Sequence, residues 1–249
     1  FGESSPALAD ATGELAYTWY KVGDYKQALP HYQQAAALHQ QADSTKGRGI
    51  ALVKVGQCHL NMNDLLPAFE SLQQASRILR PEQTSLPNEY FSNVSALRSY
   101  YVKIGDWKLA EQFADECVHR AVRDFGDDSW QHRDSLQDLA QIYRFTDRGD
   151  EAEPLVRKAL EISRTIDGDS SLNYAQALNA LALVYNYKND YFLAEPLFKQ
   201  YYDTVARIEG AESLAAAAAL GQLGRVYRSQ GKLELAEEML LKELAIDTN

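Results

Sequence analysis

The 249-residue sequence has little cysteine, little basic charge and no long apolar run. Its two cysteines, Cys58 and Cys117, are too few for a small secreted domain held together by disulfides. No stretch approaches 18 consecutive apolar residues, so no segment is predicted to span a bilayer. The start, FGESSPALAD, has neither the basic end nor the apolar centre of a signal peptide. We therefore expect a reducing, cytoplasmic location, and the first residue, Phe1, indicates a fragment or a processed product.

The deficit of basic residues bears on the class of partner. There are 25 lysines and arginines against 35 aspartates and glutamates, which gives a net charge of −10. A protein that binds the phosphates of nucleic acid usually has an excess of basic residues, and so does a protein that binds anionic membranes. We expect neither nucleic acid nor a membrane as a partner.

Motifs for catalysis and metal binding are also missing from the sequence. The five histidines are His31, His39, His59, His119 and His132. None of them belongs to an HExxH pair or to a cluster of histidine and cysteine with metal-ligand spacing. Both cysteines lie among apolar residues at helical spacing and are predicted to be small core residues. We therefore expect no metal, no cofactor and no enzymatic activity.

One short pattern, by contrast, returns at a nearly constant interval. An alanine recurs in the segments WKLAEQ, GDEAEP, YFLAEP and LELAEE, and it serves as the anchor of each unit. The anchors are Ala28, Ala68, Ala110, Ala152, Ala194 and Ala236, at spacings of 40, 42, 42, 42 and 42 residues. A period of this size is typical of repeat proteins.

Each unit is predicted to be a pair of antiparallel helices. Apolar residues recur at spacings of three and four on both sides of a short polar break, such as VGDY or KNDY. The anchor alanine and a small residue twelve positions earlier would let the two helices cross closely, where a larger side chain would be overpacked.

Glycine and proline follow the same period. Turns between units contain Gly126, Gly168 and Gly210, which are 42 residues apart and are predicted to form left-handed caps. The second helices contain Pro30, Pro154 and Pro196, which are predicted to lie early enough that the missing N–H costs little.

The pattern resembles the tetratricopeptide repeat family. Leucine, a small residue, an aromatic, glycine, an aromatic and alanine follow one another at Leu15, Ala16, Trp19, Gly23, Tyr25 and Ala28. The period of 42 resembles the long variant found in kinesin light chains. The resemblance implies an all-α fold, an α-solenoid wound as a right-handed superhelix. The predicted repeats are about 9–48, 49–90, 91–132, 133–174, 175–216 and 217–249.

The resemblance also implies a binding groove lined by the first helix of each pair. Counting from the anchors, the predicted groove residues are Lys103, Gln137, Gln141, Arg144, Asn179, Asn186, Arg225 and Arg228. Amides can bind a peptide backbone and arginines can bind carboxylates, so the expected partner is a protein or peptide, with an acidic segment favoured. Asn179 matches the first asparagine of the LNNLA motif of kinesin light chains, whereas the second position holds Ala180.

The expected function is a protein-interaction scaffold that binds a peptide in this groove. Two alternatives stay open. The chain could be a regulatory segment of a larger signalling protein. It could also self-associate through the last helix, whose apolar residues are Met239, Leu240, Leu244 and Ile246.

Overall fold

A computed structural model of the protein describes residues 5–247, and the regular elements in that range are all helical. The α-helices are α1 (Pro6–Lys21), α2 (Tyr25–Gln41), α3 (Thr45–Asn61), α4 (Leu65–Leu79), α5 (Pro87–Ile104), α6 (Trp107–Phe125), α7 (Trp130–Phe145), α8 (Gly149–Asp167), α9 (Leu172–Tyr187), α10 (Tyr191–Glu209), α11 (Leu214–Ser229) and α12 (Leu233–Asp247). A 3₁₀ helix, η1 (Arg80–Glu82), lies between α4 and α5. The predicted all-α class is confirmed.

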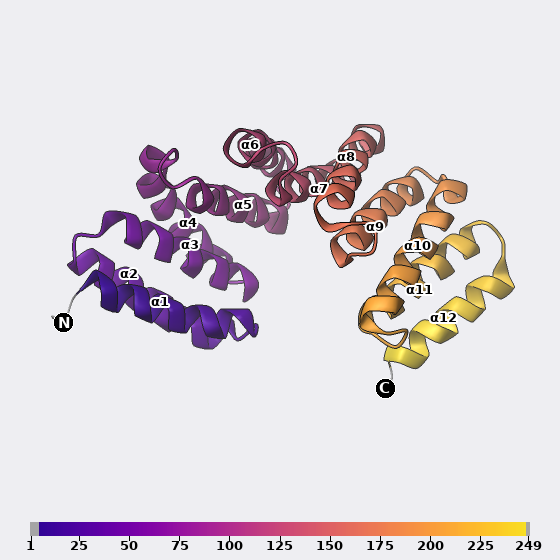
Figure 1. The fold of residues 1–249 in the computed structure, drawn as a ribbon, viewed down its shortest axis with the longest axis horizontal. Coiled ribbons are helices and arrows are strands. Elements are labelled where there is room, and N and C mark those ends of the chain that lie inside the picture. The colour runs from indigo at the N-terminus through magenta and orange to yellow at the C-terminus, as the bar shows by residue number, and fades with distance from the viewer. Residues whose placement is uncertain (1–4, 248–249) are drawn as a thin grey trace. The chain divides into compact units, whose positions relative to one another are not determined.

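The chain divides into two compact units, and the division falls inside α6, between Arg120 and Ala121. In unit 1, α1 pairs with α2 and α3 pairs with α4, while α2 also packs on α3 (Figure 1). In unit 2, the pairs are α7 with α8, α9 with α10 and α11 with α12, and each pair packs on the next (Figure 1). Each unit is thus an array of helical hairpins stacked in series, as expected. The boundaries of six repeats remain a prediction.

The anchor alanines lie where the two helices of a hairpin cross. All six are buried, and five of them have no exposed surface. A Cβ atom placed on Gly56 of α3 would lie 3.3 Å from the carbonyl oxygen of Ala68, and one on Gly224 of α11 would lie 3.3 Å from that of Ala236. The backbones therefore approach closely at these points, which confirms the reason for a small residue there.

The turn inside each hairpin contains a residue with positive φ, always five positions before the anchor alanine. These residues are Gly23, Asn63, Gly105, Asp147, Asn189 and Gly231, with φ between 60° and 81°. Asparagine and aspartate tolerate this conformation better than other residues with a side chain. The turn position is therefore conformationally uniform although its residue type varies.

The glycines between hairpins also have positive φ, but the predicted left-handed cap is wrong for Gly168 and Gly210. Gly168 combines φ 81° with ψ 162°, and Gly210 combines φ 99° with ψ 150°. This extended conformation is essentially confined to glycine. The serine three residues later caps the next helix, because Ser171 accepts a hydrogen bond from the Tyr174 N–H and Ser213 accepts one from the Ala216 N–H.

The three prolines lie deeper in their helices than expected. Pro30, Pro154 and Pro196 are each the sixth residue of α2, α8 and α10. Only the first four N–H groups of a helix lack an intrahelical acceptor, so each proline removes one hydrogen bond. All three are exposed.

The apolar core differs between the units. In unit 2 one continuous cluster runs from α7 to α12 and includes Phe198, which has no exposed surface. In unit 1 the core is divided into smaller clusters, and Cys58 and Cys117 lie in two of them. Burial raises the pKa of the Cys58 thiol to about 11 and that of Cys117 to about 12, so their predicted role as core residues is confirmed.

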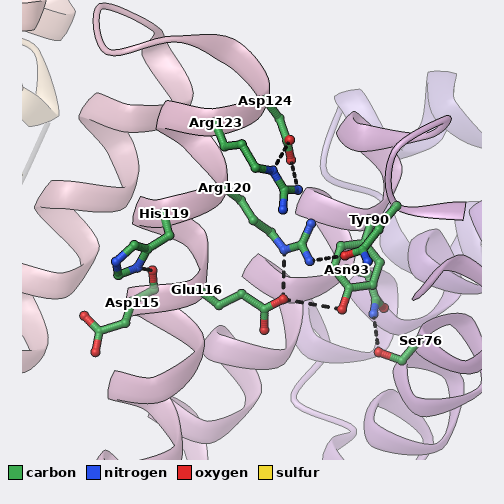
Figure 2. A network of polar contacts seen from close by, with 10 residues as sticks. Ser76, Tyr90, Asn93, Asp115, Glu116, His119, Arg120, Arg123 and Asp124 are labelled. Atoms are coloured by element: carbon green, nitrogen blue, oxygen red, sulfur yellow. Dashed lines mark hydrogen bonds and ion pairs between the residues drawn. The ribbon is translucent and has the colours of Figure 1, made fainter. Parts of the chain in front are cut away.

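A buried polar network supplements the core of unit 1 (Figure 2). Asn93 of α5, which has no exposed surface, donates from Nδ2 to Ser76 Oγ of α4 at 2.8 Å. The guanidinium of Arg120 on α6 lies 4.1 Å from the ring centroid of Tyr90 and donates from Nε to Glu116 Oε1 at 2.8 Å. The Tyr90 hydroxyl donates to the same oxygen at 3.4 Å. The network links α4, α5 and α6 through polar contacts.

Two glutamates, 42 residues apart, link consecutive hairpins of unit 2. Glu153 of α8 accepts hydrogen bonds from the Tyr185 hydroxyl and from Lys188 Nζ, both at 2.9 Å. Glu195 of α10 accepts one from Lys232 Nζ at 2.9 Å. Each glutamate directly precedes the proline of its AEP segment. The recurring AEP motif therefore includes a charged contact with the next hairpin.

These contacts lower the pKa of both carboxyl groups. The hydrogen bond from Lys188 is the main cause for Glu153, whose pKa falls to about 2 although partial burial opposes the shift. For Glu195, burial alone would raise the pKa, but hydrogen bonds from Lys199 and Lys232 lower it to about 2. Both side chains therefore stay ionised in the folded protein well below the pH at which exposed glutamates are protonated.

We predict that Glu153→Gln lowers the free energy of unfolding at neutral pH by about 1 kcal/mol. Because the folded-state pKa lies below the ordinary value of 4.5, the contribution of Glu153 is present above about pH 4.5 and is lost as the pH falls towards 2. Thermal unfolding across this range should show the two proteins converging in acid. Glu161→Gln, an exposed change on the same helix, should have almost no effect at any pH. A constant difference between Glu153→Gln and the parent protein would contradict the assignment.

Candidate functional site

A hollow of about 250 Å³ lies between α7 and α9 in unit 2, with Val156 of α8 contributing to its lining. The other lining residues are Gln137, Asp138, Ala140, Gln141 and Arg144 of α7, and Gln176, Asn179, Ala180, Leu183 and Val184 of α9. On α7 the polar residues follow spacings of four and three, so a single face of the helix carries them. The hollow therefore results from two first helices that lie side by side over a second helix.

Four of the eight predicted groove residues meet in this hollow: Gln137, Gln141, Arg144 and Asn179. The other four lie elsewhere. Lys103 is exposed near the end of α5 in unit 1, Asn186 is half-buried on α9, and Arg225 and Arg228 are exposed on α11. Four residues chosen by periodicity along the first helices thus line one hollow, and a binding role for all eight stays a prediction.

Arg144 supplies positive charge to the hollow. Its guanidinium lies 4.6 Å from the ring centroid of Phe145, and its side chain is half-buried. Burial lowers its pKa from the ordinary value, but arginine stays charged at any physiological pH. Asp138 brings a carboxylate to the same lining, so the hollow offers both signs of charge to a ligand.

Asn179 supplies an acceptor. Its Oδ1 atom is buried and makes no hydrogen bond with any other described residue. Buried polar atoms are nearly always hydrogen-bonded, because an unpaired one retains the cost of its lost hydration. An N–H group of a ligand in the hollow would satisfy this oxygen.

Comparison with known sequences decides the family. A profile of the tetratricopeptide repeat matches residues 7–80, 133–207 and 173–249, which together make up more than half of the chain. The chain belongs to the tetratricopeptide repeat family. No curated protein matches the sequence.

Solved tetratricopeptide repeat structures share the fold. BtubC (BKLC) from P. vanneervenii has 16% identity and a TM-score of 0.75, over 91% of this chain and 89% of that one. A putative kinesin light chain from Podosopora anserina, with nearly identical TPR-like repeats, has 17% identity and a TM-score of 0.70, over 82% and 97%. A Rap protein in complex with competence and sporulation factor has 13% identity and a TM-score of 0.67, over 98% and 77%. At these identities the likeness concerns the fold alone. The predicted family is confirmed by the profile match.

A tetratricopeptide repeat array presents its helix faces as interaction surfaces, so the fold is that of a protein-interaction scaffold, and it is generally not a catalytic one. Within residues 5–247, no three residues among His, Cys, Asp and Glu are grouped so that they could hold a metal ion. None of the helices described is both long and apolar enough to cross a membrane.

Sequence reasoning missed part of the lining. Gln176 precedes Asn179 by three residues and so shares its face of α9, a spacing that could have identified it. Val156 lies on a second helix, and counting along the first helices gives no signal for it. A second hollow in unit 1 was also not foreseen, because two of its buried polar groups lie on α2.

We predict that Asn179→Ala leaves stability unchanged or raises it by about 0.5 kcal/mol, because no hydrogen bond is lost and alanine favours a helix. Asn93→Ala is the matched change at a hydrogen-bonded asparagine and should cost about 1–3 kcal/mol. Urea unfolding followed by circular dichroism measures both. A loss of more than about 1 kcal/mol in Asn179→Ala would mean that its amide has a structural role.

Proposed function

We propose that the protein is an interaction scaffold that binds an extended peptide segment of a partner in the α7–α9 hollow. The observation that carries the proposal is the buried, unpaired Oδ1 of Asn179, which lies in a hollow lined by other side-chain amides. A peptide backbone provides N–H groups for such an acceptor and carbonyl groups for amide donors.

Arg144 favours a partner segment with a carboxylate. A half-buried guanidinium forms a stronger ion pair than one in full solvent, because less water screens it. Asp138 in the same lining would reject a uniformly acidic segment, so the preferred ligand has an isolated acidic residue among uncharged ones. Asn186, Arg225 and Arg228 are proposed as contacts for flanking residues of the ligand, because they lie on the first helices α9 and α11 of the same unit.

The Rap structure was solved with a bound factor, and it shares this fold. That case supports ligand binding as a use of the fold without identifying the ligand here. In the regulatory alternative, the same hollow would sense a ligand for an attached effector domain. The full-length gene distinguishes the two roles, because the regulatory role requires that it also encode an effector domain.

We predict that peptides selected by display on the purified protein will bind Arg144→Glu about tenfold more weakly than the parent protein. Arg164→Glu makes the same charge change at an exposed position of α8 that does not line the hollow, and it should change affinity by less than about twofold. Isothermal titration calorimetry with the best peptide measures both. Equal affinity for the parent protein and Arg144→Glu would remove the hollow as the site.

The last helix favours self-association as a second role. Its predicted apolar strip needs correction at two positions, because Met239 packs against the unit 2 core and Leu240 lies against Gly224 of α11. Leu244 of the same strip is 58% exposed, as predicted. The exposed apolar side chains on α12 include Leu233, at 62%, and Leu241, at 58%. Exposed apolar side chains that lie together commonly mark an interface.

If α12 mediates self-association, light scattering on the parent protein should give a mass above the 28.0 kDa of one chain, and Leu241→Glu should return it to that value. Leu66→Glu is the control, because Leu66 is equally apolar and 68% exposed but lies on α4. A parent protein that stays at the mass of one chain at micromolar concentration would exclude this role.

A further inference from the structure

Unit 1 contains a second hollow, of about 260 Å³, whose polar lining differs from that of the first. Asp10 and Glu14 of α1, Tyr32 and His39 of α2, and Lys54 of α3 line it. Asp10 and Glu14 are four residues apart, so they share one face of α1. Alanine and isoleucine side chains, Tyr17 and two glycines complete the lining and provide apolar contact surface.

Tyr32 lines this hollow, and its hydroxyl is unpaired. The residue is only 3% exposed, and its hydroxyl makes no hydrogen bond with any other described residue. Burial is the largest cause that raises its pKa, and nearby groups that include the Glu14 carboxylate raise it further. The hydroxyl therefore stays protonated and lies close enough to Glu14 to feel its charge.

His39 adds a second unpaired atom. Its Nε2 lies 3.4 Å from Asp10 Oδ1, and the ring is only 5% exposed. Nδ1 is buried without a partner among the described residues. The ring packs on Gly47, where a Cβ atom would come within 2.4 Å of it. The absence of a side chain at Gly47 therefore leaves room for the His39 ring.

The balance of charge in the hollow is negative. Asp10 and Glu14 contribute two carboxylates, against one ammonium group from Lys54. That ammonium is engaged elsewhere, since it donates to Gln57 Oε1 at 3.3 Å and lies 5.7 Å from the ring centroid of Tyr20. What remains for a ligand is mainly acceptors: the carboxylates of Asp10 and Glu14 and the oxygen of Tyr32. Such a set calls for a compact cationic donor.

We propose that the hollow between α1 and α3 binds a primary ammonium group on an aliphatic stem, supplied by a lysine side chain or by the N-terminus of a partner segment. The three hydrogens of the ammonium would be shared among the carboxylates of Asp10 and Glu14 and the oxygen of Tyr32. The stem would contact the apolar lining. This preference is opposite in charge to that of the α7–α9 hollow, and it does not depend on the function proposed there.

Gly13 gives the proposal a selective test. It lies in the middle of α1 and lines the hollow, and a Cβ atom built on it would have no neighbouring atom within 4 Å. The Cβ of Gly13→Leu would therefore meet no neighbouring atom, and the rest of the leucine side chain is expected to occupy part of the hollow. Because glycine is unfavourable inside a helix, this variant should be at least as stable as the parent protein. Loss of binding in Gly13→Leu would thus not be explained by loss of folding.

The experiment titrates the isotope-labelled full chain with Nα-acetyl-lysine methylamide and follows the amide signals of Gly13 and Gly47 by NMR. We expect saturable shifts with a Kd in the millimolar range, as for a single charged group. Nα-acetyl-norleucine methylamide has a similar stem without the amine, and it should cause no such shifts. Alaninamide presents an α-amine, so comparison with the lysine probe decides which of the two sources fits better.

Three variants complete the test. Glu14→Gln should weaken binding of the lysine probe about tenfold, whereas Glu70→Gln, an exposed change on α4, should leave it unchanged. Lys54→Met should strengthen binding several-fold, because it removes a like charge. Absence of shifts with both amines at roughly 20 mM, equal shifts with the norleucine probe, or full binding by Gly13→Leu would each overturn the proposal. None of these results bears on the α7–α9 hollow, whose residues lie in the other unit.

Discussion

The close crossing of two helices over a small side chain is the constraint on which the rest of the structure depends. Where Gly56 faces Ala68 and Gly224 faces Ala236, an added Cβ would lie 3.3 Å from the opposite carbonyl oxygen. Backbones this close fix the angle and register of the hairpin, because sliding either helix would bring a larger side chain into the crossing. Each hairpin then has a defined outer face, and the next hairpin can pack on it.

Those features that recur with the period were predictable from the sequence, and those that depend on neighbouring structure were not. The anchor alanines and the buried cysteines were placed correctly from spacing and composition. The conformation of Gly168 was not, because residue type indicates that φ can be positive but does not determine ψ. The position of Pro154 was misjudged because its helix begins at Gly149, earlier than the polar break suggested. Helix ends are set by capping and packing, which spacing alone does not report.

The same distinction applies to the candidate site. Gln137, Gln141 and Arg144 were predictable as a set because one helix face carries them, and helical periodicity is encoded locally. That Asn179 joins them requires α7 and α9 to lie side by side, which the repeat pattern implied. The absence of a hydrogen bond to its oxygen could not be predicted, because it depends on the positions of all the surrounding side chains. Tyr32 was overlooked for a related reason, since it lies on a second helix that sequence reasoning assigned to packing.

The two hollows place different polar groups on one architecture. Both lie between consecutive first helices, α1 with α3 and α7 with α9, and in both a second helix contributes to the lining. The residues that define the fold are the small ones at the crossings, and none of the polar groups in either hollow takes part in a crossing. Charge in the hollows can therefore differ without disturbing the hairpins: carboxylates and buried acceptors line one, amides and Arg144 the other. Since both hollows are built on rigid helices rather than loops, their acceptors and donors are held in place before a ligand arrives, which lowers the entropy lost on binding.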